Sequence, residues 1–100
     1  MFDKDKYLTR GINEAVPLAI QLSFWHMIEE ARPNIQLDYL QIFRLSVINT
    51  GDITIQKIIH EQERPPYKTD AVFPAFDTYS GKIYVIDDGT HSTMLLPEEY

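Results

Sequence analysis

Residues 40–62, LQIFRLSVINTGDITIQKIIHEQ, decide the fold predicted for this chain. The first part, 40–48, is rich in β-branched and aromatic residues, and Phe43, Leu45 and Val47 alternate along one face as in a half-buried strand. The Asn-Thr-Gly-Asp run at 49–52 indicates a tight turn, and a second strand follows over 53–62. The segment therefore predicts an antiparallel hairpin.

The second strand of this hairpin has an ambiguous alternation, because Ile58 and Ile59 are adjacent. Ile53, Ile55 and Ile59 form one set that could face the core, and Ile58 belongs to the offset set. A bulge, or a strand buried on both sides, would also produce this pattern. The sequence allows each of these arrangements.

Upstream of the hairpin, residues 17–31 have the apolar spacing of a helix. Pro17 suits the first turn, and Pro33 prevents much extension. Steps of 100° place apolar residues on two adjoining stripes: Leu18, Leu22, Trp25 and Ile28, and then Ile20, Phe24, Met27 and Ala31. This arc is wider than one sheet face requires, so we expect cover from two sides, by a segment of the same chain or by a second subunit.

Downstream, the sequence predicts strands over 82–86 and 92–96, and a short strand or extended loop over 71–73. The paired prolines within 64–68 interrupt the sheet, because proline lacks the N–H that a ladder needs. Residues 7–10 form a further short candidate strand. The expected fold is α+β: one domain over 1–100, with one long helix packed against an antiparallel or mixed sheet of about five strands.

The charge of the chain is uneven. The formal net charge is −6, and residues 70–100 carry one lysine against six carboxylates, a net charge of −5. This balance disfavours nucleic acid and anionic membranes as partners. The chain has no cysteine, no apolar run of the roughly 20 residues that cross a bilayer, and no apolar signal-peptide core near its start. A cytoplasmic protein is expected.

Two stretches bring together residue types that could carry chemistry. His60-Glu61-Gln62-Glu63 contains a single histidine on a predicted strand rather than the paired helical histidines of a zinc site, so we interpret it as a solvated strand end. Asp87-Asp88-Gly89-Thr90-His91 has the composition of a tight turn. An acid–base or metal site of His60, Asp87 and His91 would require the two hairpin ends to meet. No catalytic residue, metal ligand or cofactor is assigned.

Tyrosines at the ends of elements are the best indication of a binding surface, because a phenol can keep its hydroxyl wet while its ring contacts a partner. Together with the acidic turn they give the predicted binding residues: Tyr39, Tyr67, Tyr79, Asp87 and Asp88. Packing of these rings at the edge of a small core is the alternative interpretation.

Several motifs occur together in a distinctive order: KYLTRG at 6–11, LDYLQ at 37–41, QKIIHEQE at 56–63, PPYK at 65–68, VIDDG at 85–89 and STMLL at 92–96. In this order and at this length the chain resembles a family of small proteins from low-GC Gram-positive bacteria and their mobile elements, known as domain of unknown function 960. The resemblance covers essentially the whole chain. It implies a bacterial cytoplasmic protein and no particular activity, cofactor or catalytic residue.

The leading hypothesis is a non-enzymatic protein-interaction or accessory module with a protein partner. A sharper version is an acidic inhibitor of a nucleic-acid-acting protein, whose carboxylates imitate a phosphate backbone: Asp70, Asp77, Asp87, Asp88, Glu98 and Glu99. One alternative is a small metal-dependent or hydrolytic enzyme that uses His60, Asp87 and His91. Another is direct nucleic-acid binding through basic residues: Arg10, Arg44, Lys57, Arg64 and Lys68. A homodimer through the helix stripe or a free sheet edge is also expected.

Overall fold

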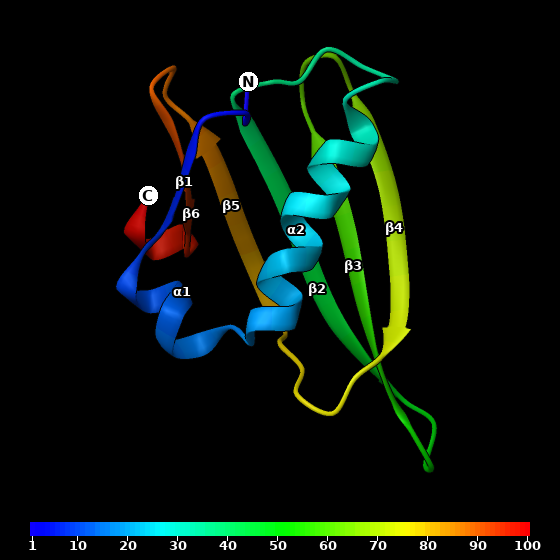
Figure 1. Ribbon diagram of the computed structural model, residues 1–100. Helices are drawn as coiled ribbons and strands as arrows, with labels where there is room; N and C mark the ends of the chain where they lie inside the picture. Colours follow the sequence, from blue (N-terminus) through cyan, green and yellow to red (C-terminus); the bar gives the residue numbers. More distant parts are fainter.

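The computed structural model describes residues 1–100 as one six-stranded mixed sheet with a helix across one face (Figure 1). In chain order the elements are β1 (Asp5–Leu8), α1 (Arg10–Ala15), α2 (Leu18–Ala31), β2 (Leu40–Asn49), β3 (Thr54–Gln62), β4 (Tyr67–Pro74), β5 (Gly81–Asp87), β6 (His91–Leu95) and the 3₁₀ turn η1 (Pro97–Glu99). The strand order is β1-β6-β5-β2-β3-β4. β1 runs parallel to β6, and the other pairs are antiparallel.

The predicted α+β class and mixed sheet are confirmed, but the sheet has six strands rather than about five. The largest difference is β4, for which only 71–73 was predicted as a short strand or loop. It begins at Tyr67, because the interruption by the two prolines stays within the turn at 63–66 and does not reach the following residues. β1 likewise covers Asp5–Leu8 rather than 7–10.

The helical part differs from the prediction of one long helix. α2 has 14 residues and starts at Leu18, with Pro17 at its N-cap position. α1 was not predicted. Thr9 caps it, because its hydroxyl oxygen accepts a hydrogen bond from the Ile12 amide at 3.3 Å. No helix of the chain combines the length and the apolar character needed to cross a membrane.

α2 buries the stripe that contains Ile20, Phe24 and Met27 against the sheet. The Phe24 ring lies 4.6 Å from that of Phe43 on β2. The second predicted stripe is covered only in part: Ile28 is buried, whereas Leu18 and Leu22 are exposed. The expected two-sided cover therefore exists near the C-terminal end of α2 and not near its start.

The register of the hairpin resolves the ambiguity in β3. Phe43 pairs with His60 and Leu45 with Ile58, so the offset set, with Ile58, faces α2. The alternative set of Ile53, Ile55 and Ile59 was wrong for the core. Phe43 decides this register, because its contact with α2 fixes which face of β2, and hence of β3, is buried.

Candidate functional site

The face of the sheet opposite α2, here called the open face, has no long helix over it (Figure 1). The C-terminal turn covers only part of it, where Tyr100 meets Tyr84 and where Ile42 and Leu95 are buried. Side chains alternate along a strand, so the partners of the core-facing residues must point to this side. The residues of the central strands on the open face are Ile42, Arg44, Ser46 and Ile48 from β2, Ile55, Lys57, Ile59 and Glu61 from β3, and Lys82 and Tyr84 from β5. β4 adds Lys68, Asp70 and Val72.

One end of the open face is apolar. Ile48 pairs with Ile55, which in turn pairs with Pro74, and this row crosses β2, β3 and β4. Val72 lies in the next row and is 59% exposed. Phe76, in the loop after β4, is 106% exposed, which means that nothing in the chain covers its ring.

A shallow pocket of about 240 Å³ lies at this end. Its lining consists of Asp52, Ile53, Thr54, Pro74, Ala75 and Phe76. We call Ile48, Ile53, Ile55, Val72, Pro74 and Phe76 together the apolar end. Exposed apolar groups that gather in this way mark interaction sites more often than single exposed residues do.

The middle of the open face is basic, in contrast to the chain as a whole. Arg44 pairs with Lys82 in the β2–β5 register, and Lys57 sits one row nearer the apolar end. Arg44 forms an ion pair with Glu61, and the Lys82 ammonium lies 5.1 Å from the centre of the Tyr84 ring. Because Lys57 and Lys82 are in no ion pair, the middle keeps a net positive charge.

Aromatic residues occupy the other end of the open face. The rings of Tyr84 and Tyr100 meet edge to face at 5.4 Å. The phenol of Tyr100 also raises the pKa of Tyr39 by a hydrogen-bonding interaction. The phenol hydroxyls at this end offer groups that can both donate and accept hydrogen bonds.

Beneath α2 lies a strip of buried polar side chains that is closed to solvent. His60 Nε2 lies 2.6 Å from Gln41 Oε1, and Gln41 Nε2 donates to Gln62 Oε1 at 2.8 Å. The Phe43 ring stacks on the imidazole at 4.5 Å. The prediction that His60 is a solvated strand end was wrong: it is completely buried, because its register places it opposite Phe43.

Burial lowers the pKa of His60 to about 4, so the imidazole is neutral at physiological pH. Its Nδ1 atom is buried without a hydrogen-bond partner. No carboxylate contacts the ring, and no group of three His, Asp or Glu side chains is arranged to hold a metal ion. His60 therefore acts as a packing residue with one specific hydrogen bond.

The acidic turn is structural, as its composition predicted. Asp88 Oδ1 accepts hydrogen bonds from the amides of Thr90 and His91 at 2.9 and 3.0 Å, and Gly89 adopts φ of +95°. The bonds from His91 and Thr90 lower the pKa of Asp88 to about 2. This carboxylate is committed to its own backbone.

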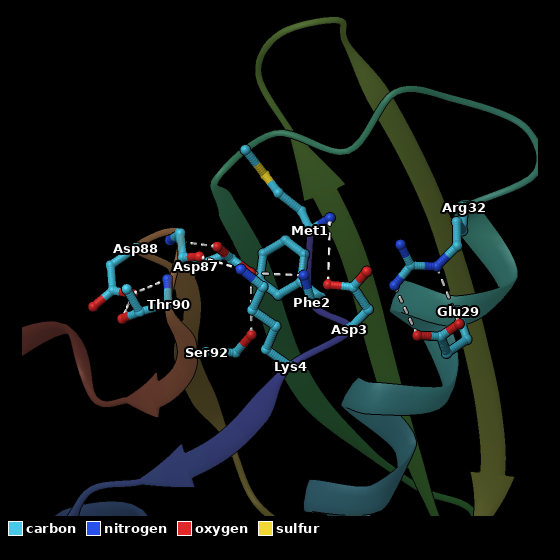
Figure 2. Close-up of polar contacts among 11 residues, drawn as sticks. Met1, Phe2, Asp3, Lys4, Glu29, Arg32, Asp87, Asp88, Thr90 and Ser92 are labelled. Carbon is cyan, nitrogen blue, oxygen red and sulfur yellow. Dashed lines mark hydrogen bonds and ion pairs between the residues drawn. The ribbon is translucent and has the colours of Figure 1, made fainter.

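Asp87 anchors the N-terminal segment. Its Oδ2 accepts the Phe2 amide at 2.6 Å and its Oδ1 the Gly89 amide at 2.7 Å (Figure 2). Burial alone would raise its pKa, but these hydrogen bonds hold the pKa below its usual value. Phe2 adopts φ of +60°, a conformation that a bulky residue rarely takes, and its ring is fully buried in the core.

The sequence matches the model of a family described as staphylococcal protein of unknown function (DUF960), over residues 5–99. The chain belongs to this family. A solved structure described as a protein of unknown function from Enterococcus faecalis is similar, with 25% identity and a TM-score of 0.72. The match covers 98% of this chain and 92% of that one. No curated protein matches the sequence. Both descriptions concern bacterial proteins, and neither names an activity.

The predicted binding residues do not form one site in this DUF960 protein. Tyr39 and Asp87 are neighbours, because the Asp87 amide donates to the Tyr39 carbonyl at 2.9 Å. Tyr67 lies on β4 with its ring edge toward His60. Tyr79 is in the β4–β5 loop, where its backbone exchanges hydrogen bonds with the Gln56 side chain. Burial raises the pKa of Tyr79.

The residues of the enzyme hypothesis are also separated. His60 on β3 and His91 on β6 are three strand spacings apart, roughly 14 Å. They also point to opposite faces, because His91 alternates with the buried Ser92. The geometry gives these two histidines and Asp87 no common substrate or metal.

The six carboxylates of the mimic hypothesis do not share a face. Asp70 is on β4 at one edge of the sheet, whereas Glu99 lies beside β1 at the other edge. Glu99 accepts hydrogen bonds from the Thr9 hydroxyl at 2.6 Å and the Leu96 amide at 2.9 Å, which lower its pKa. Asp87 is buried. Three of the six, Asp87, Asp88 and Glu99, are therefore hydrogen-bonded within the fold.

The apolar end was missed by the sequence reasoning. Ile53 and Ile55 were considered for the core, and Phe76 carried no pattern at all. The second apolar set of β3, with Ile53 and Ile55, could have indicated it: if Ile58 faces α2, this set must lie on the opposite face of the sheet.

Proposed function

We propose that this protein is a non-enzymatic interaction module that binds a protein partner through the open face of its sheet. The observation that carries the proposal is the apolar end, where Phe76 is fully exposed beside Ile53 and Pro74. Exposing these side chains costs solvation free energy, about 25 cal/mol per Å² of apolar surface, which binding would recover.

The charge and the apolar character of the open face indicate what kind of surface the partner has. Lys57 and Lys82 border the apolar end on a chain whose net charge is −6. A complementary surface has apolar side chains at its centre and carboxylates at its rim, because opposite charges across an interface steer the encounter. Tyr39 and Tyr100 provide hydrogen-bonding groups at the far end of the same surface.

The proposal includes a cytoplasmic location, which the absence of cysteine favours. It also includes the association with mobile elements that the resemblance implied, so the partner is to be sought among enzymes of the bacterial host or of such an element.

The experiment is affinity capture from nuclease-treated host lysate with three tagged proteins: the wild type, Phe76→Glu and Leu18→Glu. Leu18 is a matched control, because it is an exposed apolar residue on the other layer, over α2. A protein retained by the wild type and Leu18→Glu but lost by Phe76→Glu is the expected result. We then expect the purified pair to bind at least tenfold more weakly with Phe76→Glu. Retention that is equal for all three proteins would contradict the assignment of the surface.

Direct nucleic-acid binding is a second candidate, because Arg44, Lys57 and Lys68 do share the open face, together with Lys82. Two carboxylates, Glu61 and Asp70, are interspersed among them. Arg10 is elsewhere, paired with Glu14 on α1 at 2.9 Å. Binding of single-stranded DNA or RNA that weakens steeply with salt, and that Lys57→Glu abolishes, would favour this candidate.

A further inference from the structure

β4 is a free sheet edge of unusual regularity. It is the last strand in the order, and it pairs with β3 over eight consecutive residues without a bulge. Natural proteins commonly shorten, twist or cover such an edge, because its unpaired N–H and C=O groups can bind another strand. α2 crosses one face of the sheet and ends beside the start of β4, and no other strand or helix lies along the outer edge of β4 (Figure 1).

The hydrogen-bond register identifies which backbone groups of β4 are free. The Ala75 amide donates to the Thr54 carbonyl at 3.0 Å, so this is a hydrogen-bonded pair of the antiparallel ladder. Bonded and non-bonded pairs alternate along such a ladder. Lys68, Asp70 and Val72 therefore direct their N–H and C=O groups away from β3, toward solvent.

We infer that β4 pairs with β4 of a second copy of this chain, antiparallel about a two-fold axis at Thr69, to join the two sheets edge to edge. In this register Lys68 of each copy lies opposite Asp70 of the other, so the pairing forms an ion pair on each side of the axis. A two-residue shift of register, which moves the axis by one residue, places Asp70 opposite Asp70, and the same shift the other way places Lys68 opposite Lys68. Charge complementarity thus selects one register.

The other face of β4 also accommodates a second copy. Tyr67, Thr69 and Ala71 line a groove of about 440 Å³ beside α2. In the inferred register Tyr67 of one copy lies opposite Ala71 of the other, a large residue against a small one. A single strand pair buries less than a standard interface, so we expect a dimer with a dissociation constant in the micromolar range. The open face is left free in both copies.

Disulfide trapping tests this register directly, because the chain contains no cysteine. Thr69 would face itself in a non-bonded pair, where Cα atoms lie about 4.5 Å apart, within disulfide range. We expect Thr69→Cys to form a covalent dimer under mild oxidation. Val72→Cys is the matched control on the same edge: it would face Pro66 of the other copy and should stay monomeric. Cross-linking of Val72→Cys instead, or of neither variant, would overturn the inference.

Charge reversal provides a second test with intact folding, because Lys68 and Asp70 are exposed. Sedimentation should show that Lys68→Asp and Asp70→Lys each weaken dimerisation about tenfold, and that the double variant restores it. A wild-type protein that stays monomeric at about 100 μM would rule the dimer out. A Phe76→Glu variant that dimerises normally would separate this interface from the partner-binding surface.

Discussion

His60 shows how a single residue couples the fold to pH. In the unfolded chain its pKa is the ordinary 6.5, whereas burial lowers it to about 4 in the folded protein. Between these values the unfolded chain binds a proton that the folded protein excludes. The free energy of unfolding should therefore fall by about 3 kcal/mol as the pH drops from 6.5 to 4, and this contribution is fully present above pH 6.5.

Urea unfolding at a series of pH values checks this, with His60→Phe as the comparison. Phenylalanine keeps a ring against Phe43 but cannot titrate, so its stability should change less over this range. The carboxylates titrate in both proteins and cancel in the difference. Parallel pH profiles for the two proteins would contradict the assignment.

A second prediction at the residue scale compares Phe2 with Phe76, because these two phenylalanines are at opposite extremes of burial. Phe2 is 0% exposed and Phe76 is 106% exposed. Phe2→Ala should lower the free energy of unfolding by about 3–5 kcal/mol, and Phe76→Ala should change it by less than about 0.5 kcal/mol. Denaturant titration measures both. A large loss for Phe76→Ala would mean that the ring serves the fold rather than a partner.

At the scale of the element, α2 has two apolar stripes of unequal use. Phe24 is buried against Phe43, whereas Leu22 is 57% exposed. Phe24→Ala should cost about 3–5 kcal/mol of stability, and Leu22→Gln less than about 0.5 kcal/mol. Thermal unfolding monitored by circular dichroism compares them. A loss above about 2 kcal/mol for Leu22→Gln would show that another chain covers this stripe in solution.

The strands β3 and β4 differ in their position in the sheet, and this difference decides which of them can bind another strand. β3 lies between β2 and β4, and its side chains that face α2, among them Ile58 and His60, are buried. β4 has only one neighbour, and every second residue along it is exposed. The two strands pair over their whole length, yet only β4 has free hydrogen-bonding groups, and this difference in position makes it the candidate for pairing between copies.

At the scale of the whole molecule, the single helical layer is the decisive feature. One 14-residue helix covers one face of a six-stranded sheet, and on the other face only the part near Tyr84 is covered, by the C-terminal turn. The rest of that face is exposed to solvent unless a partner binds it. The open face mixes an apolar end, a basic middle and an aromatic end. If two copies join along β4, two such faces lie side by side, and a partner with repeated sites would bind more tightly than a single copy allows.

The hairpin and α2 could be predicted because their signals are local: alternation within one strand, a turn rich in Gly and Asn, and a helical period between two prolines. The turn at Asp87-Asp88-Gly89 was predictable for the same reason. β4 was not, because its pairing with β3 stabilises a segment whose own sequence contains only a short apolar run. α1 was also missed, since six residues are too few for a clear period.

The candidate site was less predictable than the fold. Tyr39 lies at the aromatic end of the open face, but Tyr67 and Tyr79 are elsewhere. Which face of β3 is buried depends on the contact between Phe24 and Phe43, which are far apart in the chain.

The sequence by itself determined the class of fold, the central hairpin and the acidic turn, because neighbouring residues suffice to form them. Only the tertiary structure decided that His60 is buried, that the acidic residues are dispersed, that most of one face is open and that β4 lies at an edge of the sheet. These outcomes depend on which strands become neighbours, and strand order is set by long-range packing that no local pattern encodes.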